Sequence, residues 1–277
     1  MWWRKKTLRS SKMMRRKRRS SFFRFFLVIS VFVLLVVGSA YLLKRPEVTI
    51  KNIILDGNKT VSTEILESFV KEKLLGNYLF IFPRSSIFIY PRRIIEENIP
   101  LKFKKIKTTK VTFNNFDSIT VTVKERIPKA LWCGENRLEG AIPECFFLDE
   151  KGFLYTQSPS FTGDVNFRFY GPLGEGSSIG QQFLPEKKFQ EISFFLQSLQ
   201  ESDIQAVELA IGDERDYELY LENGTQVLFS QDEELSMVLD NLQSTLLSDT
   251  FKEHGEVRID YIDLRFGNKV YYKFKDE

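Results

Sequence analysis

The longest apolar segment of the chain is Phe25–Leu43, in which no residue is charged. A helix of these 19 residues is about 28 Å long, at a rise of about 1.5 Å per residue, which matches the hydrocarbon thickness of a bilayer. Gly38 and Ala40 also have the spacing of a secretory cleavage site, so a cleaved signal peptide is the alternative. Because the apolar run continues past that point through Tyr41–Leu43, we predict an uncleaved transmembrane helix over residues 25–43.

After this segment, the pattern predicts a short strand and two amphipathic helices. The strand spans Val48–Leu55 and ends at the turn Asp56-Gly57-Asn58, after which Ser62 is a suitable N-cap for a helix. The apolar positions of this first helix precede a stop at Gly76 and are Ile65, Leu66, Phe69, Val70 and Leu74. The second helix has Pro91 at its first turn and Pro100 beyond its end, with Ile94, Ile95 and Ile99 facing inward.

Beyond Pro100 the apolar period changes to two, which is typical of strands. A strand rich in Lys and Thr ends near Phe113, a turn follows at residues 114–117, and Ile119, Val121 and Val123 then alternate with polar residues. The order strand, helix, helix, strand, strand predicts a three-stranded sheet with two helices on one face. About eighty residues are enough for such a unit to enclose a small core.

Strands dominate the pattern after Ala130. They are predicted at Phe146–Asp149, Val207–Ile211, Tyr217–Leu221 and Val227–Phe229, and residues 171–180 form a glycine-rich loop. Two helices interrupt them, one marked by Phe189, Ile192, Phe195, Leu196 and Leu199, the other by Leu235, Val238, Leu239, Leu242 and Leu246. Ser230 and Glu233 have the spacing of a capping box for the second of these helices, and Asn223-Gly224 predicts a hairpin turn.

The last segment predicts a hairpin that forms an edge of a sheet. Ile259–Phe266 is its first strand, Gly267-Asn268 its turn, and Val270, Tyr272 and Phe274 alternate along its second strand. The fold class is therefore α+β. It comprises a single N-terminal transmembrane helix, a β-α-α-β-β domain, and a mixed, mostly antiparallel β domain with two helices.

Charge is distributed unevenly along the chain. Residues 1–24 carry 11 of the 40 Lys and Arg residues and no acidic residue, so the remainder has 29 basic and 37 acidic residues, a net charge of −8. Because basic flanks are retained on the cytoplasmic side, we expect the basic tail (residues 1–24) inside and the bulk of the chain outside. Because the net positive charge is confined to this tail, the sequence excludes nucleic acid as the main partner and favours contact with membrane lipid. A recruitment tail is the other interpretation of residues 1–24.

The sequence contains no recognisable catalytic or metal-binding constellation. His254 is the only histidine and lies in a polar Lys-Glu-His-Gly segment, and two cysteines without a further pair do not make a structural zinc site. The loop at residues 171–180 lacks the Gly-Lys-Ser/Thr ending of a phosphate-binding loop. Adjacent acids such as Glu96/Glu97 and Glu233/Glu234 point in different directions on a helix. We therefore expect no enzyme activity, no cofactor, no metal and no small-molecule substrate.

Cys133 and Cys145 are the only cysteines, and they bracket a polar segment with Gly134, Gly140 and Pro143. A hairpin disulfide between them is one alternative and a pair of free or buried thiols is the other. The sequence does not decide between the two, since it does not give the distance between the sulfur atoms.

Several short motifs, taken in their order, resemble one family. The segment from Val48 through Asp56-Gly57-Asn58 to Val121-Thr122-Val123-Lys124-Glu125-Arg126-Ile127-Pro128-Lys129-Ala130 is similar to a POTRA domain that runs into the Val-x-Glu-Arg-x-Pro-x-Ala junction of FtsQ/DivIB division proteins. Three downstream segments resemble further family motifs: Leu148-Asp149-Glu150-Lys151-Gly152, Leu221-Glu222-Asn223-Gly224 and Ile262-Asp263-Leu264-Arg265-Phe266. The chain departs from the family at Asn114-Asn115, where a proline is common, and in the cysteine-flanked insertion 133–145.

This resemblance implies a domain organisation and a cellular role. Residues 48–125 would be a POTRA-like domain and residues 126–277 an FtsQ-type β domain. The protein would be a non-enzymatic scaffold in the plasma membrane at the division septum, linking coiled-coil partners of the FtsB/DivIC and FtsL type to the septal machinery. A POTRA-containing export or envelope-assembly factor is the alternative, and it would need repeated POTRA units or a barrel. A membrane-anchored cell-wall enzyme is a third alternative, and it would need a catalytic constellation.

If the final hairpin is an edge, its backbone can accept a strand from a partner, with alternate side chains giving specificity. The residues that we expect to bind the partner are Arg265, Val270, Tyr271, Tyr272 and Phe274. The alternative is that these residues simply complete the core.

Overall fold

A computed structural model describes residues 11–137, 140, 143–159, 167–212, 216–248, 259–267 and 269–275 of the 277-residue chain. The expectations for residues 1–10, His254 and Asn268 lie outside these described residues. The chain divides into two compact units, with Met1–Leu101 and Thr108–Lys124 in unit 1 and Lys102–Lys107 and Glu125–Glu277 in unit 2. The protein is a mixed α+β structure, and each unit has its own sheet.

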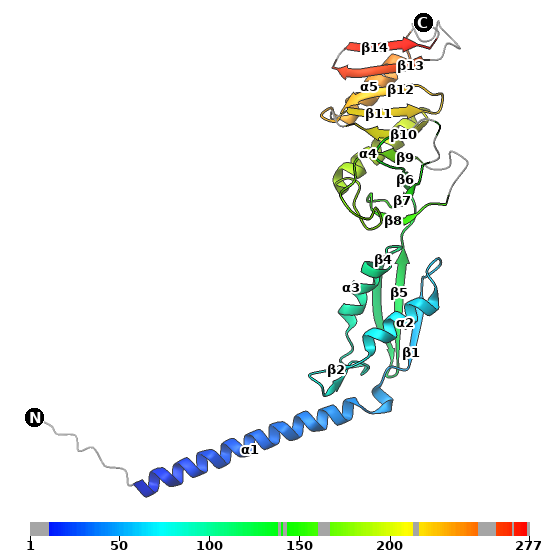
Figure 1. Cartoon of the computed structure of the whole chain (residues 1–277). Coiled ribbons are helices and arrows are strands. Elements are labelled where there is room, and N and C mark those ends of the chain that lie inside the picture. The colour runs from blue at the N-terminus through cyan, green and yellow to red at the C-terminus, as the bar shows by residue number, and fades with distance from the viewer. Residues whose placement is uncertain are drawn as a thin grey trace, which may run out of the picture. The chain divides into compact units, whose positions relative to one another are not determined.

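Unit 1 begins with the long helix α1 (Ser11–Leu43), shown in Figure 1. Its part Ser21–Leu43 contains an 18-residue stretch with a mean hydropathy of 2.7 and is long and apolar enough to be a membrane span or a signal sequence. The helix begins earlier than Phe25, because residues 11–24 contain no Gly or Pro and are rich in Arg, Lys and Met, which favour helix. Among residues 21–43, Ala40 is the one buried side chain, and Val36 and Leu43 on the same face are partly covered.

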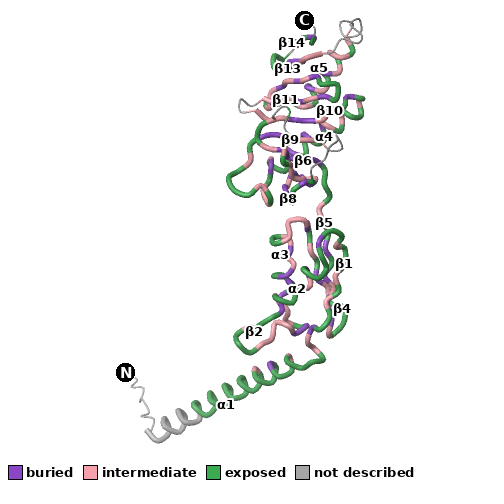
Figure 2. Tube along the Cα trace, turned by 45° about the vertical axis from the view of Figure 1, so that its right-hand side comes forward, coloured by how far each residue is buried: buried purple, intermediate pink, exposed green. Residues whose placement is uncertain are grey.

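The sheet of unit 1 has three strands in the order β1-β5-β4. β1 (Asn52–Asp56) pairs in parallel with β5 (Ser118–Glu125), and a two-residue turn joins β4 (Ile106–Asn115) to β5. The helices α2 (Thr63–Leu74) and α3 (Arg92–Lys102) lie on one side of this sheet (Figures 1 and 2). Leu66, Val70, Ile95, Ile99, Val111, Ile119 and Val121 form the fully buried centre of the unit.

A small hairpin that the pattern did not predict, β2 (Asn77–Tyr78) and β3 (Phe82–Pro83), lies between α2 and α3 in the chain.

As predicted, Ser62 caps α2 by accepting a hydrogen bond from the Ile65 amide at 3.4 Å. The strand β1 starts later than predicted because Pro46–Val48 forms a 3-10 turn, for which the fixed φ of proline is suited.

Two expectations for the helices of unit 1 are wrong. Ile65 and Ile94 are 54% and 42% exposed, because each precedes the first buried residue of its stripe by one position, a rotation of about 100°. Pro100 lies inside α3, not beyond it, and the helix continues to Lys102. A proline so close to the end removes only one backbone hydrogen bond, and the buried Ile99 holds the last turn in place.

Unit 2 contains a nine-stranded mixed sheet in the order β14-β13-β12-β11-β10-β9-β6-β7-β8. Most neighbouring pairs are antiparallel, and β6/β9, β9/β10 and β12/β13 are parallel. The strands are β6 (Ala130–Trp132), β7 (Phe146–Leu148), β8 (Leu154–Gln157), β9 (Arg168–Tyr170), β10 (Ala206–Ile211), β11 (Asp216–Leu221), β12 (Gln226–Ser230), β13 (Ile259–Phe266) and β14 (Lys269–Phe274). Figure 1 shows them stacked along the length of the unit.

Two helices, α4 (Glu186–Glu201) and α5 (Leu235–Leu246), cover one face of this sheet and bury its core. Phe189, Ile192, Phe195 and Leu199 of α4 and Val238 and Leu242 of α5 are buried against the strands, as their spacing predicted. The predicted capping box at Ser230 and Glu233 is wrong. Ser230 ends β12 and its hydroxyl accepts a hydrogen bond from the Asp232 amide at 3.2 Å, so α5 begins later, with Glu234 as its N-cap.

Candidate functional site

The strand β14 is the last strand of the unit 2 sheet, and β13 is its only neighbour among the described strands. The opposite edge, β8, is covered by the loop that joins β9 to α4. The Leu154 amide donates to the Gln181 carbonyl at 2.9 Å, and the Gly180 amide donates to the Leu154 carbonyl at 2.8 Å. Among the described strands, β14 is therefore the edge at which another strand can add.

The side chains of β14 alternate between the two faces of the sheet. Tyr272 lies opposite the fully buried Ile262 and so faces the side that the helices cover, whereas Tyr271 lies opposite Asp263 on the other side. The exposed fractions of Tyr271 and Tyr272 are 51% and 41%. Since both rings are exposed at one strand edge, a strand added there would contact an aromatic side chain on each face.

Two of the predicted contact residues belong instead to the core. Phe274 is buried, with only 4% of its surface exposed, and Val270 is half-buried against the main core cluster. The ring of Tyr272 lies edge-on to that of Phe274 at 5.5 Å. For Val270 and Phe274, the structure thus agrees with the alternative that they complete the core, and Tyr271 and Tyr272 remain as the accessible pair.

Arg265 is held on the open face of the sheet by two carboxylates. Its guanidinium donates to both oxygens of Asp263, at 2.9 and 2.7 Å, and to Asp216 on β11 at 2.6 Å. The hydrogen bond from Arg265 lowers the pKa of Asp263. The arginine therefore ties β13 to β11, across the intervening β12.

The edge strand carries exposed positive charge. Lys269 and Lys273 lie in β14 and Lys275 follows it, and all three are exposed. The ammonium group of Lys275 lies 3.4 Å from the Gly224 carbonyl. Lysines on an edge strand discourage pairing with a second copy of the same edge and favour a partner segment with carboxylates.

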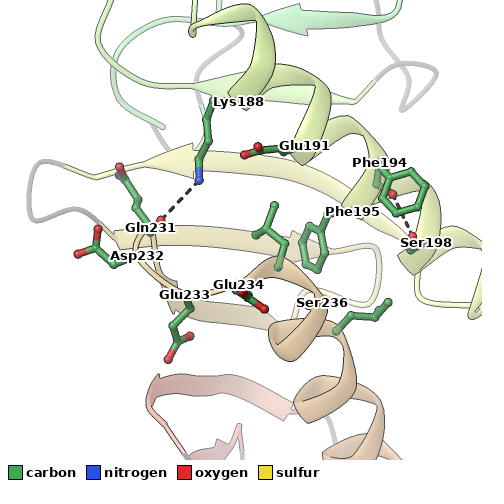
Figure 3. A pocket seen from close by; sticks show the side chains of 12 residues that line it. Lys188, Glu191, Phe194, Phe195, Ser198, Gln231, Asp232, Glu233, Glu234 and Ser236 are labelled. Carbon is green, nitrogen blue, oxygen red and sulfur yellow. Dashed lines mark hydrogen bonds between the residues drawn. The ribbon is translucent and has the colours of Figure 1, made fainter.

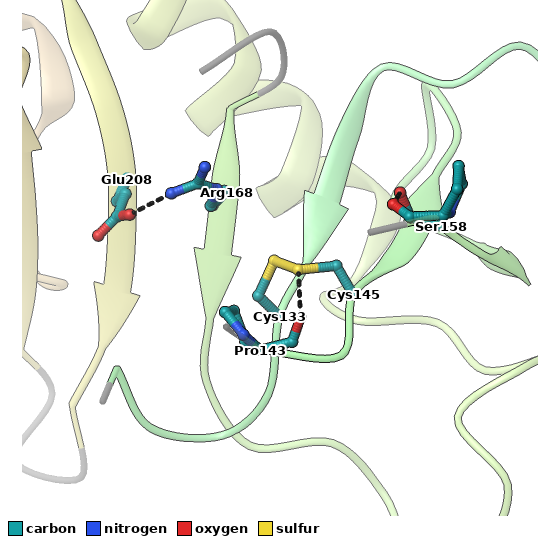
Figure 4. The surroundings of a disulfide bond; sticks show 7 residues. Cys133, Pro143, Cys145, Ser158, Arg168 and Glu208 are labelled. Carbon is teal, nitrogen blue, oxygen red and sulfur yellow. Dashed lines mark hydrogen bonds and ion pairs between the residues drawn. A yellow bond between two sulfur atoms is a disulfide. The ribbon is translucent and has the colours of Figure 1, made fainter. Parts of the chain in front are cut away.

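Cys133 and Cys145 are joined in a disulfide, with an S–S distance of 2.07 Å (Figure 4). With Leu131 and Tyr170 they form a small cluster separate from the main core. Beside it, the buried carboxylate of Glu208 accepts hydrogen bonds from Arg137 at 2.5 Å and Arg168 at 2.9 Å. Arg137 also lies 4.2 Å above the ring of Tyr220, so the described part of the cysteine-flanked insertion is fixed to β10 and β11.

Two of the motif segments meet in one buried ion pair within unit 2. Arg126 of the Glu-Arg-Ile-Pro segment donates to Asp149 of the Asp-Glu-Lys-Gly segment, whose side chain is fully buried. Asp149 also accepts the backbone amides of Lys151 and Phe153 at 2.9 and 3.0 Å. The guanidinium of Arg126 lies 4.1 Å from the ring centre of Phe153. These contacts give both motifs a structural role.

The face that carries the helices also has a groove of about 500 Å³ between α4 and the start of α5 (Figure 3). Its apolar lining includes Phe194, Phe195, Leu235 and Leu239, and its polar lining includes Glu191, Asp232, Glu233 and Glu234. Lys188 crosses one end and lies 3.5 Å from the Gln231 carbonyl. The groove therefore joins an apolar floor to an acidic rim.

The groove lining offers carboxylates, hydroxyls and one lysine. Burial, together with the nearby Asp263, raises the pKa of Glu233. Within the described parts of the chain, no three His, Cys, Asp or Glu residues are close enough to hold a metal ion.

The sequence interpretation missed the groove, the Arg126–Asp149 pair and the Arg137–Glu208–Arg168 cluster. Only the motif spacing at Arg126 and Asp149 offered a signal, because the other two sites join residues far apart in the sequence whose strands become neighbours in the sheet. No family model matches the chain, and no curated protein matches it.

Proposed function

We propose that this chain is a non-enzymatic, single-pass membrane scaffold of the FtsQ/DivIB kind, which links coiled-coil partners of the FtsB/DivIC and FtsL type at the division septum. The observation that carries the proposal is the edge strand β14, which has no described strand beyond it and exposes Tyr271 and Tyr272. The ordered motifs of the sequence support the choice of family, and α1 supports the membrane anchor.

Strand addition explains how such a scaffold binds without a deep pocket. A partner segment in extended conformation pairs with β14 through backbone hydrogen bonds, which supply affinity without regard to sequence. Specificity comes from the side chains, with Tyr272 on the helix-covered face, Tyr271 on the other, and the lysines at positions 269 and 273. We therefore expect the partner segment to carry an apolar residue for each tyrosine and at least one carboxylate.

The arrangement of unit 1 supports the POTRA-like assignment of this proposal. Its strands and helices follow the order β1, α2, α3, β4, β5, with β1 beside β5 in the sheet. In the proposal the sheet and helices of this unit, which follow the anchor in the chain, would help to recruit the protein to the septum.

Binding of a purified partner tests the edge. The full chain in nanodiscs is titrated with an FtsB/DivIC-type partner, and Tyr271→Lys and Tyr272→Lys are expected to weaken the Kd at least tenfold, as loss of a central aromatic contact does. The matched control is Met237→Lys, which changes a comparably exposed apolar side chain, 53% accessible, on α5 and outside the groove lining. Thermal unfolding of each variant separates lost contact from lost fold. Unchanged affinity in both tyrosine variants with an intact fold contradicts strand addition at β14.

Imaging tests the cellular role. A fluorescent fusion of the full chain is expected to concentrate at the septum late in the cell cycle, and its depletion is expected to block septation. Uniform envelope fluorescence with normal septation would contradict the division role and favour an export or assembly factor.

A further inference from the structure

The hairpin of β2 and β3 presents the most exposed apolar side chains of unit 1. At its tip, Leu79 is 80% exposed, Phe80 97% and Ile81 41%. Leu79 and Phe80 also have positive φ angles of 47° and 63°, which residues other than glycine rarely adopt. Positive φ at two residues other than glycine costs conformational energy, and an exposed apolar tip of this kind is typical of a contact surface.

Hydrogen bonds tie the segment directly after this hairpin to the chain that leaves α1. The Ile50 amide donates to the Ser85 carbonyl at 2.8 Å, and the Ile87 amide donates to the Val48 carbonyl at 2.9 Å. The strand β3 also contacts α1 directly. In Figures 1 and 2, the hairpin labelled β2 accordingly lies near the C-terminal end of α1.

The burial of α1 shows at which level of the helix this contact occurs. Ala40 is only 5% exposed, and Val36 and Leu43, which share its face, are partly covered. Ala40 precedes the last residue of α1 by three positions, which is about 4.5 Å along a helix. The hairpin therefore lies at the level of the last turns of the apolar segment, where a bilayer has its interface.

Other exposed apolar residues gather at the same end of the unit 1 sheet. The carbonyl of Asp117, in the β4–β5 turn, accepts the Lys51 amide at 2.8 Å, which places Phe116 at the start of β1. Phe116 is 61% exposed, and its ring lies 6.4 Å from that of Phe88, which is 63% exposed. This end also carries Lys44 and Arg45, directly after α1.

We propose that Leu79, Phe80 and Ile81, with Phe88 and Phe116, form a membrane-contact surface that inserts into the outer-leaflet interface beside α1. The inference rests on the membrane anchor in the proposed function, and it adds a membrane-contact surface beside the single helix of that anchor. Aromatic and aliphatic side chains are stable at this depth, and Lys44 and Arg45 suit the phosphates of the headgroups. A lipid surface is the occupant because α1, in contact with the hairpin, is the element that lipid surrounds.

Such a surface fixes the orientation of unit 1 with respect to the bilayer. An anchor consisting of one helix lets the attached unit turn freely, whereas a second attachment a short distance away restricts that rotation. The hairpin thus gives unit 1 a defined side that faces lipid.

Depth measurements on the full chain test the proposal. The protein is reconstituted in vesicles of phosphatidylethanolamine and phosphatidylglycerol, without reductant, so that Cys133 and Cys145 stay bonded. An environment-sensitive fluorophore is attached to Phe80→Cys or, separately, to Phe88→Cys. The matched control is Lys124→Cys, an exposed position in β5 at the opposite end of the same sheet.

We expect the labels at positions 80 and 88 to show blue-shifted emission, quenching by nitroxide lipids labelled near the headgroup, and protection from aqueous iodide. The label at position 124 is expected to show iodide quenching alone. Iodide quenching at positions 80 and 88 equal to that at position 124, without nitroxide quenching, would overturn the proposal.

A fourth label, on Val33→Cys in the middle of α1, separates this inference from the proposed anchor. If lipids labelled deep in the acyl chain quench the label at position 33 while the label at position 80 is exposed to water, the membrane-contact surface is refuted and the anchor is retained. Aqueous exposure of the label at position 33 refutes the anchor and, with it, the membrane-contact surface.

Discussion

Replacement of Asp149 by alanine should destabilise unit 2 severely. The carboxylate is fully buried and the side chain of its partner Arg126 is only 13% exposed, so the substitution leaves an uncompensated charge inside the unit. Arg126 cannot withdraw easily, because its Nε donates to the Lys104 carbonyl at 3.0 Å and its guanidinium lies against Phe153.

The magnitude follows from the lost partners. Removing one member of a buried ion pair costs about 3–5 kcal/mol. The amides of Lys151 and Phe153 lose their acceptor too, at about 1 kcal/mol each where water does not replace it. Because these costs overlap, we expect Asp149→Ala to lower the free energy of unfolding by about 4 kcal/mol. Asp149→Asn keeps an oxygen acceptor and should lose about half as much.

Chemical unfolding of the full chain in detergent micelles measures this loss. Trp132 is buried in β6 and donates to the Gly171 carbonyl at 3.0 Å, so its fluorescence reports on unit 2 in a background with Trp2→Phe and Trp3→Phe. The control is Glu191→Ala, which removes the partner of Lys187 in a pair with 92% and 47% exposed side chains and should cost no more than about 0.5 kcal/mol. A loss below about 1 kcal/mol for Asp149→Ala would refute the reasoning, because even surface ion pairs reach that value.

Three further predictions follow from contacts described above. Gly57→Ala should lower the free energy of unfolding of unit 1 by about 3 kcal/mol. Gly57 has φ +86°, and an added Cβ would overlap the Val123 carbonyl. Thermal unfolding measures the loss, and Gly38→Ala, whose added Cβ meets no neighbour, is the control. Arg265 lowers the pKa of Asp263, so ionised Asp263 stabilises the fold at pH values above its ordinary pKa of 3.8, and this contribution is lost as the pH falls through the lowered pKa. Asp263→Asn should therefore reduce the loss of stability at acid pH, measured as the free energy of unfolding against pH. The same pH dependence in the variant and the parent would contradict this. Cys133→Ser with Cys145→Ser should cost about 3 kcal/mol through the freed loop, and a reductant should reproduce that loss in the parent but change nothing in the double variant.

Local patterns in the sequence were sufficient to locate several elements. The buried stripe Phe189, Ile192, Phe195 and Leu199 located α4, because one helical face is covered and the others are not. The Asn223-Gly224 pair located the β11–β12 turn, where the Thr225 amide donates to the Asn223 side chain at 3.0 Å. In both cases the determining interactions lie within a few residues.

The order of strands could not be predicted in the same way. β6 and β9 are three residues long and pair in parallel although they are far apart in the sequence, and β9 also pairs with β10. The partner of such a short strand depends on the packing of the whole sheet, not on its own residues. The same reason explains Phe274, whose alternation was predicted but whose burial depends on the neighbouring β13.

The parallel pairing of β1 with β5 also affects how the chain is made. The two strands are the first and last of the unit 1 sheet, and Asn52 pairs with Ser118. When β1, α2 and α3 have been synthesised, the chain still lacks β5, the strand that lies between β1 and β4 in the sheet. The three-stranded sheet cannot form before β5 is present. Unit 1 therefore completes this sheet only after β5 has emerged, and until then the apolar faces of α2 and α3 lack the sheet that covers them.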